Sequence, residues 1–259
     1  MKAIAARRHH RFAPAVLLAL ALVLTGGLYA ALAPSAEGAA APTTDDVEAG
    51  RALFVANCAT CHGVNAEGRD GNPTLIGVGA AAVDFQVSTG RMPMQLEGPQ
   101  AAAKPPQFDR EQINQLAAYV ATLGPGPAIP SAEQVDPALG DPANGGAIFR
   151  TNCAMCHGAI GAGGALSEGK YAPALAQSTP TEIYEAMLTG PQSMPVFNDA
   201  NITPEEKRDV IAFLEEQKNG SPGGTTLGSI GPVGEGIWIW VVGMGLLIAS
   251  AVWIGAKSS

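Results

Sequence analysis

Apolar positions divide the 259-residue chain into two long hydrophobic runs and a middle part of mixed pattern. Residues 12–33 are almost wholly apolar, and residues 237–256 contain no charged side chain. Between these runs, apolar residues such as Ile113, Leu116 and Val120 recur with helical spacing. The pattern predicts an all-α protein with an N-terminal hydrophobic segment and a C-terminal transmembrane helix.

The N-terminal run follows a basic stretch in residues 1–11, an order that is typical of an export segment. As a helix, residues 12–33 would span about 33 Å, which is enough to cross a bilayer. Residues 31–33 read Ala-Leu-Ala and resemble a cleavage site, but Pro34 directly after them disfavours cleavage. Residues 1–33 are therefore a removed signal peptide or, as Pro34 favours, a retained membrane anchor.

The C-terminal run, residues 237–256, follows a tether of seven glycines and two prolines in residues 219–236. Trp238 and Trp253 lie near its two ends, as interfacial anchors do, so a transmembrane helix is favoured over a buried soluble one. The basic N-terminal stretch and Lys257 predict that both termini are cytoplasmic, if the first segment is retained. The residues between would lie on the extracytoplasmic side of the cell membrane.

The middle part is an internal repeat of two predicted domains, residues 45–123 and 140–218, joined by a Gly- and Pro-rich linker at 124–139. Each predicted last helix begins with a capping signal. These signals are Asp109 with Gln112, and Thr203-Pro204 with Glu206. The matching pairs are Gly50 and Gly145, Phe54 and Phe149, Pro73 and Pro173, and Thr89-Gly90 and Thr189-Gly190.

Each domain contains one Cys-x-x-Cys-His sequence, which is the attachment signature of a c-type haem. Two thiols at this spacing form thioethers to one porphyrin, and the adjacent His is the proximal ligand of the iron. A redox dithiol or a zinc site is the alternative. However, the Cys pairs start 95 residues apart, far beyond the roughly 15–20 of a zinc ribbon. We expect two covalently bound haem c groups, on Cys58, Cys61 and His62 and on Cys153, Cys156 and His157.

Composition supports this expectation. Aromatic residues make up only 5% of the chain, so two domains of this size have little material for a protein-only core. A covalent haem would supply a large apolar surface at the centre of each fold. The net charge of −8 makes nucleic acid an unexpected partner and suits electron transfer with a basic partner.

The order of these features resembles the class I cytochrome c domain, twice over. The resemblance implies that a Gly and an aromatic residue on the first helix pack against an aromatic residue on the last. It also implies that a Pro carbonyl after the haem motif accepts the Nδ1–H of the proximal His, which fixes the imidazole. The residues in these places are Gly50, Phe54, Tyr119 and Pro73 in the first domain, and Gly145, Phe149, Phe213 and Pro173 in the second.

The sixth ligand of each iron is expected to be Met. The other two histidines, His9 and His10, belong to the N-terminal basic stretch, and Met is the usual partner of His in cytochromes c. A Met-Pro pair after the Thr-Gly turn is where the resemblance places this ligand. It points to Met194 in the second domain and Met92 in the first, with Met94 as the alternative to Met92.

Arg91 lies directly before Met92 in the sequence. Arginine commonly pairs with carboxylates, so Arg91 is a candidate partner for a haem propionate. A solvated surface arginine is the alternative.

Two irons with His and Met ligands and no open coordination site suit one-electron transfer. The layout, with Thr-Gly-Arg-Met-Pro at 89–93, resembles the dihaem cytochrome c subunit of actinobacterial quinol–cytochrome c reductase. The resemblance implies a subunit beside cytochrome b that carries electrons from the Rieske iron–sulfur protein to an aa-type oxidase. The enzyme would be the whole complex, and the chain alone would not be catalytic.

Three alternatives remain at this stage. One is the dihaem subunit of a cbb-type oxidase, which carries an N-terminal anchor but no second span at the C-terminus. Another is a membrane-tethered carrier outside any complex. A third is a dihaem enzyme such as a peroxidase or thiosulfate dehydrogenase, and a peroxidase would need one iron with an open site.

Overall fold

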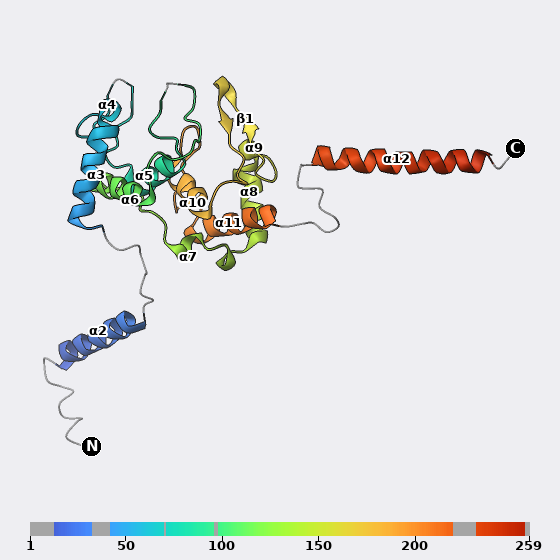
Figure 1. Ribbon diagram of the computed structural model, residues 1–259. Helices are drawn as coiled ribbons and strands as arrows, with labels where there is room; N and C mark the ends of the chain where they lie inside the picture. The colour runs from blue at the N-terminus through green and yellow to red at the C-terminus, as the bar shows by residue number, and fades with distance from the viewer. Residues whose placement is uncertain (1–12, 33–41, 70, 96–97, 220–231, 257–259) are drawn as a thin grey trace, which may run out of the picture. The chain divides into compact units, whose positions relative to one another are not determined.

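A computed structural model describes residues 13–32, 42–69, 71–95, 98–219 and 232–256 (Figure 1). The prediction of an all-α fold with tandem domains is confirmed, and the described strands are limited to one short hairpin. The first domain contains α3 (Thr44–Asn57), α4 (Ala59–His62), α5 (Gly79–Ser88) and α6 (Arg110–Ala121). The segment between the domains contains α7 (Ala132–Val135) and η2 (Pro137–Leu139). The second domain contains α8 (Pro142–Asn152), α9 (Ala154–His157), β1 (Gly164–Ala165), η3 (Ser167–Gly169), β2 (Tyr171–Ala172), α10 (Pro180–Thr189) and α11 (Pro204–Asn219).

The last helix of each domain begins where the capping signals predict. Asp109 accepts a hydrogen bond from the backbone N–H of Gln112 at 2.9 Å, and the Gln112 side chain accepts one from Asp109 at 3.2 Å. Thr203 and Glu206 form the same reciprocal pair before α11, which has Pro204 as its first residue. These bonds satisfy backbone donors that a helix start otherwise leaves unpaired.

First and last helices cross closely in both domains, α3 on α6 and α8 on α11 (Figure 1). A Cβ atom on Gly50 would lie 1.9 Å from the carbonyl oxygen of Gln115, so only glycine allows this approach. A Cβ atom on Gly145 would likewise lie 1.9 Å from the carbonyl oxygen of Asp209. Each crossing also carries the expected aromatic pair, Phe54 with Tyr119 at 5.3 Å and Phe149 with Phe213 at 5.4 Å between ring centroids.

The two domains belong to one compact unit, residues 44–259, in which α5 of the first domain packs on α10 of the second. The segment between the domains is ordered and lies against both of them. Ala81 donates its backbone N–H to the carbonyl of Pro127 at 3.1 Å, while η2 and α7 pack on α11. The linker is therefore part of the packed structure.

A carboxyl pair is buried where α5 meets α10. Asp84 is 2% exposed and forms an ion pair with Arg110, and Glu185 is fully buried against Asp84. Burial and the neighbouring Asp84 raise the pKa of Glu185 to about 10. Neither oxygen of Glu185 has a donor among the described residues, and a proton on Glu185 would let it donate to Asp84 without placing two charges side by side.

The two repeats differ in length at two places. His157 is 16 positions before Pro173, whereas His62 is 11 positions before Pro73. The longer segment of the second domain forms the antiparallel hairpin β1–β2. Conversely, 20 positions separate Thr89 from Asp109, against 14 from Thr189 to Thr203, and the longer first-domain segment forms a loop after Met92.

Two apolar helices complete the described chain. α12 (Pro232–Ala256) contains a span, Gly236–Ala256, that is long and apolar enough to cross a membrane, as predicted for residues 237–256. Its described side chains, including Trp238 and Trp253, are exposed, so the helix is not the buried core helix of a soluble domain. α2 (Ala13–Leu32) falls in the predicted N-terminal segment, whose proposed cleavage site at residue 33 lies outside the described residues.

Candidate functional site

The first Cys-x-x-Cys-His motif begins at Cys58, directly after α3, and its other four residues form the short helix α4. His62, the last residue of α4, is 9% exposed, and its Nδ1 lies 2.8 Å from the carbonyl oxygen of Pro73. Since a carbonyl only accepts, Nδ1 carries the proton, which leaves Nε2 as the nitrogen with a free lone pair. This is the bond predicted for the proximal ligand of a class I domain.

The second motif repeats this geometry. α9 ends at His157, whose Nδ1 lies 3.0 Å from the carbonyl oxygen of Pro173. In both motifs the first Cys is half-buried and the second is exposed. Cys58 packs against the core of the first domain and Cys153 against the core of the second, so the two Cys pairs do not share one site.

The first thiol of each motif does not have the lowered pKa of a redox dithiol. Burial raises the pKa of Cys58 to about 11, and the nearby Cys61 adds to the rise. Burial and Cys156 raise the pKa of Cys153 to about 11 in the same way. A reactive dithiol of the thioredoxin kind depends on a lowered thiol pKa, and these sites have the opposite environment.

The structure separates the two Met candidates of the first domain. Met92 packs against the same core cluster as Cys58, and its backbone N–H donates to the carbonyl of Gln86 at 2.9 Å. Met94 is 37% exposed. The geometry therefore favours Met92 as the residue that faces the first haem site.

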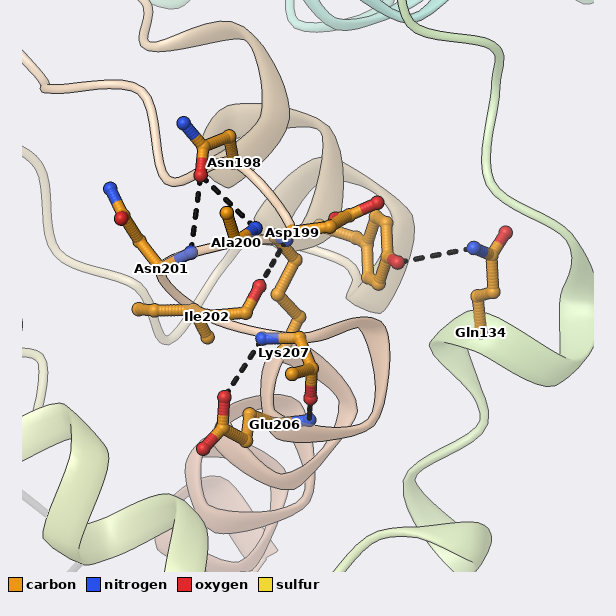
Figure 2. A network of polar contacts seen from close by, with 10 residues as sticks. Gln134, Asn198, Asp199, Ala200, Asn201, Ile202, Glu206 and Lys207 are labelled. Atoms are coloured by element: carbon orange, nitrogen blue, oxygen red, sulfur yellow. Dashed lines mark hydrogen bonds and ion pairs between the residues drawn. The ribbon is translucent and has the colours of Figure 1, made fainter.

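In the second domain, Met194 packs against the same core cluster as Cys153. The loop that follows it is held by a buried cation, as Figure 2 shows. Lys207, fully buried, donates from Nζ to Asp199 and to the carbonyl of Ile202, both at 2.6 Å. The Asn198 side chain accepts from two backbone N–H groups of the same loop, so residues 198–202 are held by side-chain hydrogen bonds.

A cavity of about 520 Å³ lies beside the second motif, within the usual range for cofactor sites. Cys153, Cys156, His157 and Met194 all line it. Two thiols, an imidazole and a thioether around a mainly apolar hollow are the donors that a covalent haem with two axial ligands requires. The residues present thus fit haem c.

Sequence reasoning did not find that part of this cavity wall comes from the first domain. Phe85, Arg91 and Lys104 line the cavity together with the second-domain motif. The different lengths of the two repeats were the available signal, because the longer first-domain loop contains Lys104. The buried pair of Asp84 and Glu185 was also missed, since helical patterns do not show which carboxylates face another domain.

Sequence comparisons agree with this geometry. The family described as Cytochrome c matches residues 47–124, and the family described as Cytochrome C oxidase, cbb3-type, subunit III matches residues 140–214. The relatives that match nearly the whole chain include proteins named cytochrome bc1 complex cytochrome c subunit. That of Corynebacterium efficiens is 45% identical over 97% of this chain and 92% of its own length. That of Corynebacterium diphtheriae is 43% identical over 99% of both chains, and that of Mycobacterium tuberculosis strain H37Rv is 45% identical over 97% of this chain and 93% of its own length.

Three observations agree. The chain has two cytochrome c domains with matching motifs, it has a C-terminal apolar helix, and its identity to these relatives extends along nearly its full length. The chain belongs to the family of cytochrome bc1 complex cytochrome c subunits.

Proposed function

We propose that this chain is the dihaem electron carrier of a quinol–cytochrome c reductase complex. Each domain holds one covalent haem c, which supplies one-electron oxidation and reduction when bound. Cys58 and Cys61 attach the first, and Cys153 and Cys156 the second. The observation that carries the proposal is the full-length relation to bc1 complex subunits, together with the two matching His–Pro bonds.

The axial ligands we propose are His62 with Met92, and His157 with Met194. The Pro73 and Pro173 carbonyls orient the two imidazoles by accepting their Nδ1–H groups. Lys207 holds Asp199 and Ile202 in the loop that follows Met194. Because a closed His/Met set leaves no site for substrate, the chain alone is not expected to be catalytic.

We further propose the route of the electrons and the partners. The first domain receives electrons from the Rieske iron–sulfur protein beside a cytochrome b, and the second passes them to an aa-type terminal oxidase. α12 anchors the chain in the cell membrane, with both haem domains on the extracytoplasmic side. The termini are then cytoplasmic, if the N-terminal segment is retained.

The order of the two domains is testable in membranes. Replacing Cys153 and Cys156 with Ala should remove the second haem alone. Added quinol should then still reduce the first haem, while quinol-dependent oxygen uptake is lost. The matched variant, Cys58 and Cys61 to Ala, should leave the second haem oxidised under quinol. Reduction of the second haem in that variant would contradict the proposed order.

A second candidate is the dihaem subunit of a cbb-type oxidase, because the family match over residues 140–214 carries that description. That match covers one domain only, whereas the bc1 relatives match nearly the whole chain including the C-terminal span. The composition of the purified complex distinguishes these two functions.

A further inference from the structure

The cavity beside the second motif is built by both domains. Second-domain residues supply the two thiols, the imidazole and the thioether, and a first-domain segment closes another side. Ser88, Thr89, Arg91 and Lys104 of that segment line the same cavity. Any group bound to the second motif therefore also faces the first domain.

The charges around this cavity are unevenly divided between the domains. Among the described lining residues, the lysine and arginine side chains are Arg91 and Lys104, and both belong to the first domain. The second domain contributes a carboxylate instead, Glu182. A ligand with carboxylates of its own would find its counter-charges only across the domain boundary.

Arg91 is held in place at this boundary. Its guanidinium carbon lies 4.8 Å from the centroid of the Phe85 ring, a cation–π arrangement, and the side chain is half-buried. Burial lowers the pKa of Arg91, and the second-domain residues Tyr171 and Glu182 act in the opposite direction. Arg91 thus lies within electrostatic reach of the second domain while Met92, the next residue, packs in the first.

The first-domain loop that contains Lys104 is hydrogen-bonded to the second domain. The Gln100 side chain donates to the carbonyl of Tyr171 and accepts from its N–H, both at 2.9 Å. Ala101 donates its N–H to the side chain of Gln192 at 3.2 Å. Lys104 is tied back to its own domain through Pro93, whose carbonyl accepts from Nζ at 3.2 Å.

We propose that Arg91, a first-domain residue, binds a propionate carboxylate of the haem in the second domain, with Lys104 as the supporting cation. This inference rests on the proposed function, since it requires a haem on the second motif. It makes Arg91 a positioning residue that acts across the domain boundary. Because Arg91 and Met92 are consecutive, one short segment then contacts both haem sites.

The physical reason for this contact is that a carboxylate without a partner in a half-buried site costs free energy. Arginine satisfies a carboxylate with two parallel hydrogen bonds, whereas lysine supplies a point charge only. A cation beside the propionate also disfavours the extra positive charge of the oxidised iron. Removing the cation should therefore lower the midpoint potential of the second haem.

The test is a redox titration of the detergent-solubilised full-length holoprotein. In Arg91→Gln, the equilibrium of the second haem should shift towards its oxidised form about tenfold, which is about 59 mV downward for a one-electron couple. Lys104→Gln should give a smaller downward shift, and Arg91→Lys should restore part of the potential. Arg150→Gln removes the same charge from an exposed position of the second domain outside the cavity and should cause no shift.

The two titration waves are assigned beforehand with Met194→His. This substitution should lower the midpoint potential of the second haem only. An unchanged second wave in Arg91→Gln, or a shift confined to the first wave, would overturn the inference. An equal shift in Arg150→Gln would also overturn it, since a general field effect would then suffice. Mass spectrometry of the wild-type Cys153 peptide separates these failures from that of the proposed function, because a peptide without haem contradicts the function itself.

Discussion

At the scale of single residues, the candidate ligands are positioned by the groups they contact. Both proximal histidines donate Nδ1–H to a proline carbonyl, at 2.8 Å and 3.0 Å. The resemblance to class I cytochrome c domains predicted these bonds, because a Pro-x-Leu sequence follows each motif. The surroundings of the Met residues were not predictable in this way, since a short polar loop does not reveal which of two methionines faces inward.

Met194→His should retain the covalent haem but lower the potential of the second centre markedly. Thioether ligation favours the reduced iron, and imidazole favours the oxidised iron. A redox titration of the purified chain checks this, with the first wave as the internal reference. If the second wave stayed where it is in the wild type, Met194 would not be the ligand.

Met92→Ala should open a coordination site on the first haem, because no other described Met packs beside Cys58 in that core. A carbon monoxide difference spectrum of the reduced protein should then show new binding. Met94→Ala is the matched control, and its exposed side chain predicts no new binding. Binding in the Met94 variant alone would exchange the two assignments.

At the scale of elements, the capping signals predicted where the last helix of each domain begins, because capping depends on local chemistry. The resemblance to class I cytochrome c domains, found twice in one chain, predicted the two glycine-mediated crossings. The hairpin β1–β2 was not predicted, since its strands are only two residues long. It contacts the first-domain loop through Gln100, and local sequence does not encode such a contact between domains.

Gly145→Ala should destabilise the second domain by about 1–3 kcal/mol, as overpacking in a tight core does. The new Cβ would lie 1.9 Å from a backbone oxygen of α11, so the helices must separate. Thermal unfolding followed at the haem absorbance measures the effect. Gly98→Ala is the control, because Gly98 is exposed with its nearest neighbour at 4.0 Å, and an equal loss there would refute the crossing argument.

The carboxyl pair between α5 and α10 should make stability depend on pH. The folded pKa of Glu185, about 10, lies above its ordinary value of 4.5, so the folded state holds a proton that the unfolded state releases. Stability from this group is complete below pH 4.5 and is lost as pH rises towards 10, by at most about 1.4 kcal/mol per pH unit. Asp84, Arg110 and Glu182 are the charged groups that face it.

Glu185→Gln removes the ionisable group but keeps the shape, so unfolding midpoints measured from pH 6 to pH 9 should vary less than in the wild type. The exposed Glu216→Gln serves as the matched control and should follow the wild-type profile. An unchanged slope in Glu185→Gln would mean that Glu185 is ionised in the folded protein.

At the scale of the whole molecule, the two domains are interlocked parts of one unit. Each repeat is longer than the other at one place, and these two longer segments meet through Gln100 and Tyr171. The repeat itself was readable from the sequence, but the contact between its copies was not. The two Cys-x-x-Cys-His motifs are therefore held within one compact unit.

The central claim is that this chain carries electrons inside a bc1-type complex. The most direct measurement is purification in mild detergent through a tag after Ser259, with haem staining and identification of the subunits. We predict co-purification of a cytochrome b, a Rieske protein and aa-type oxidase subunits with a haem-staining chain. Recovery with a cbb-type oxidase alone, or as a lone dihaem chain, would contradict the account.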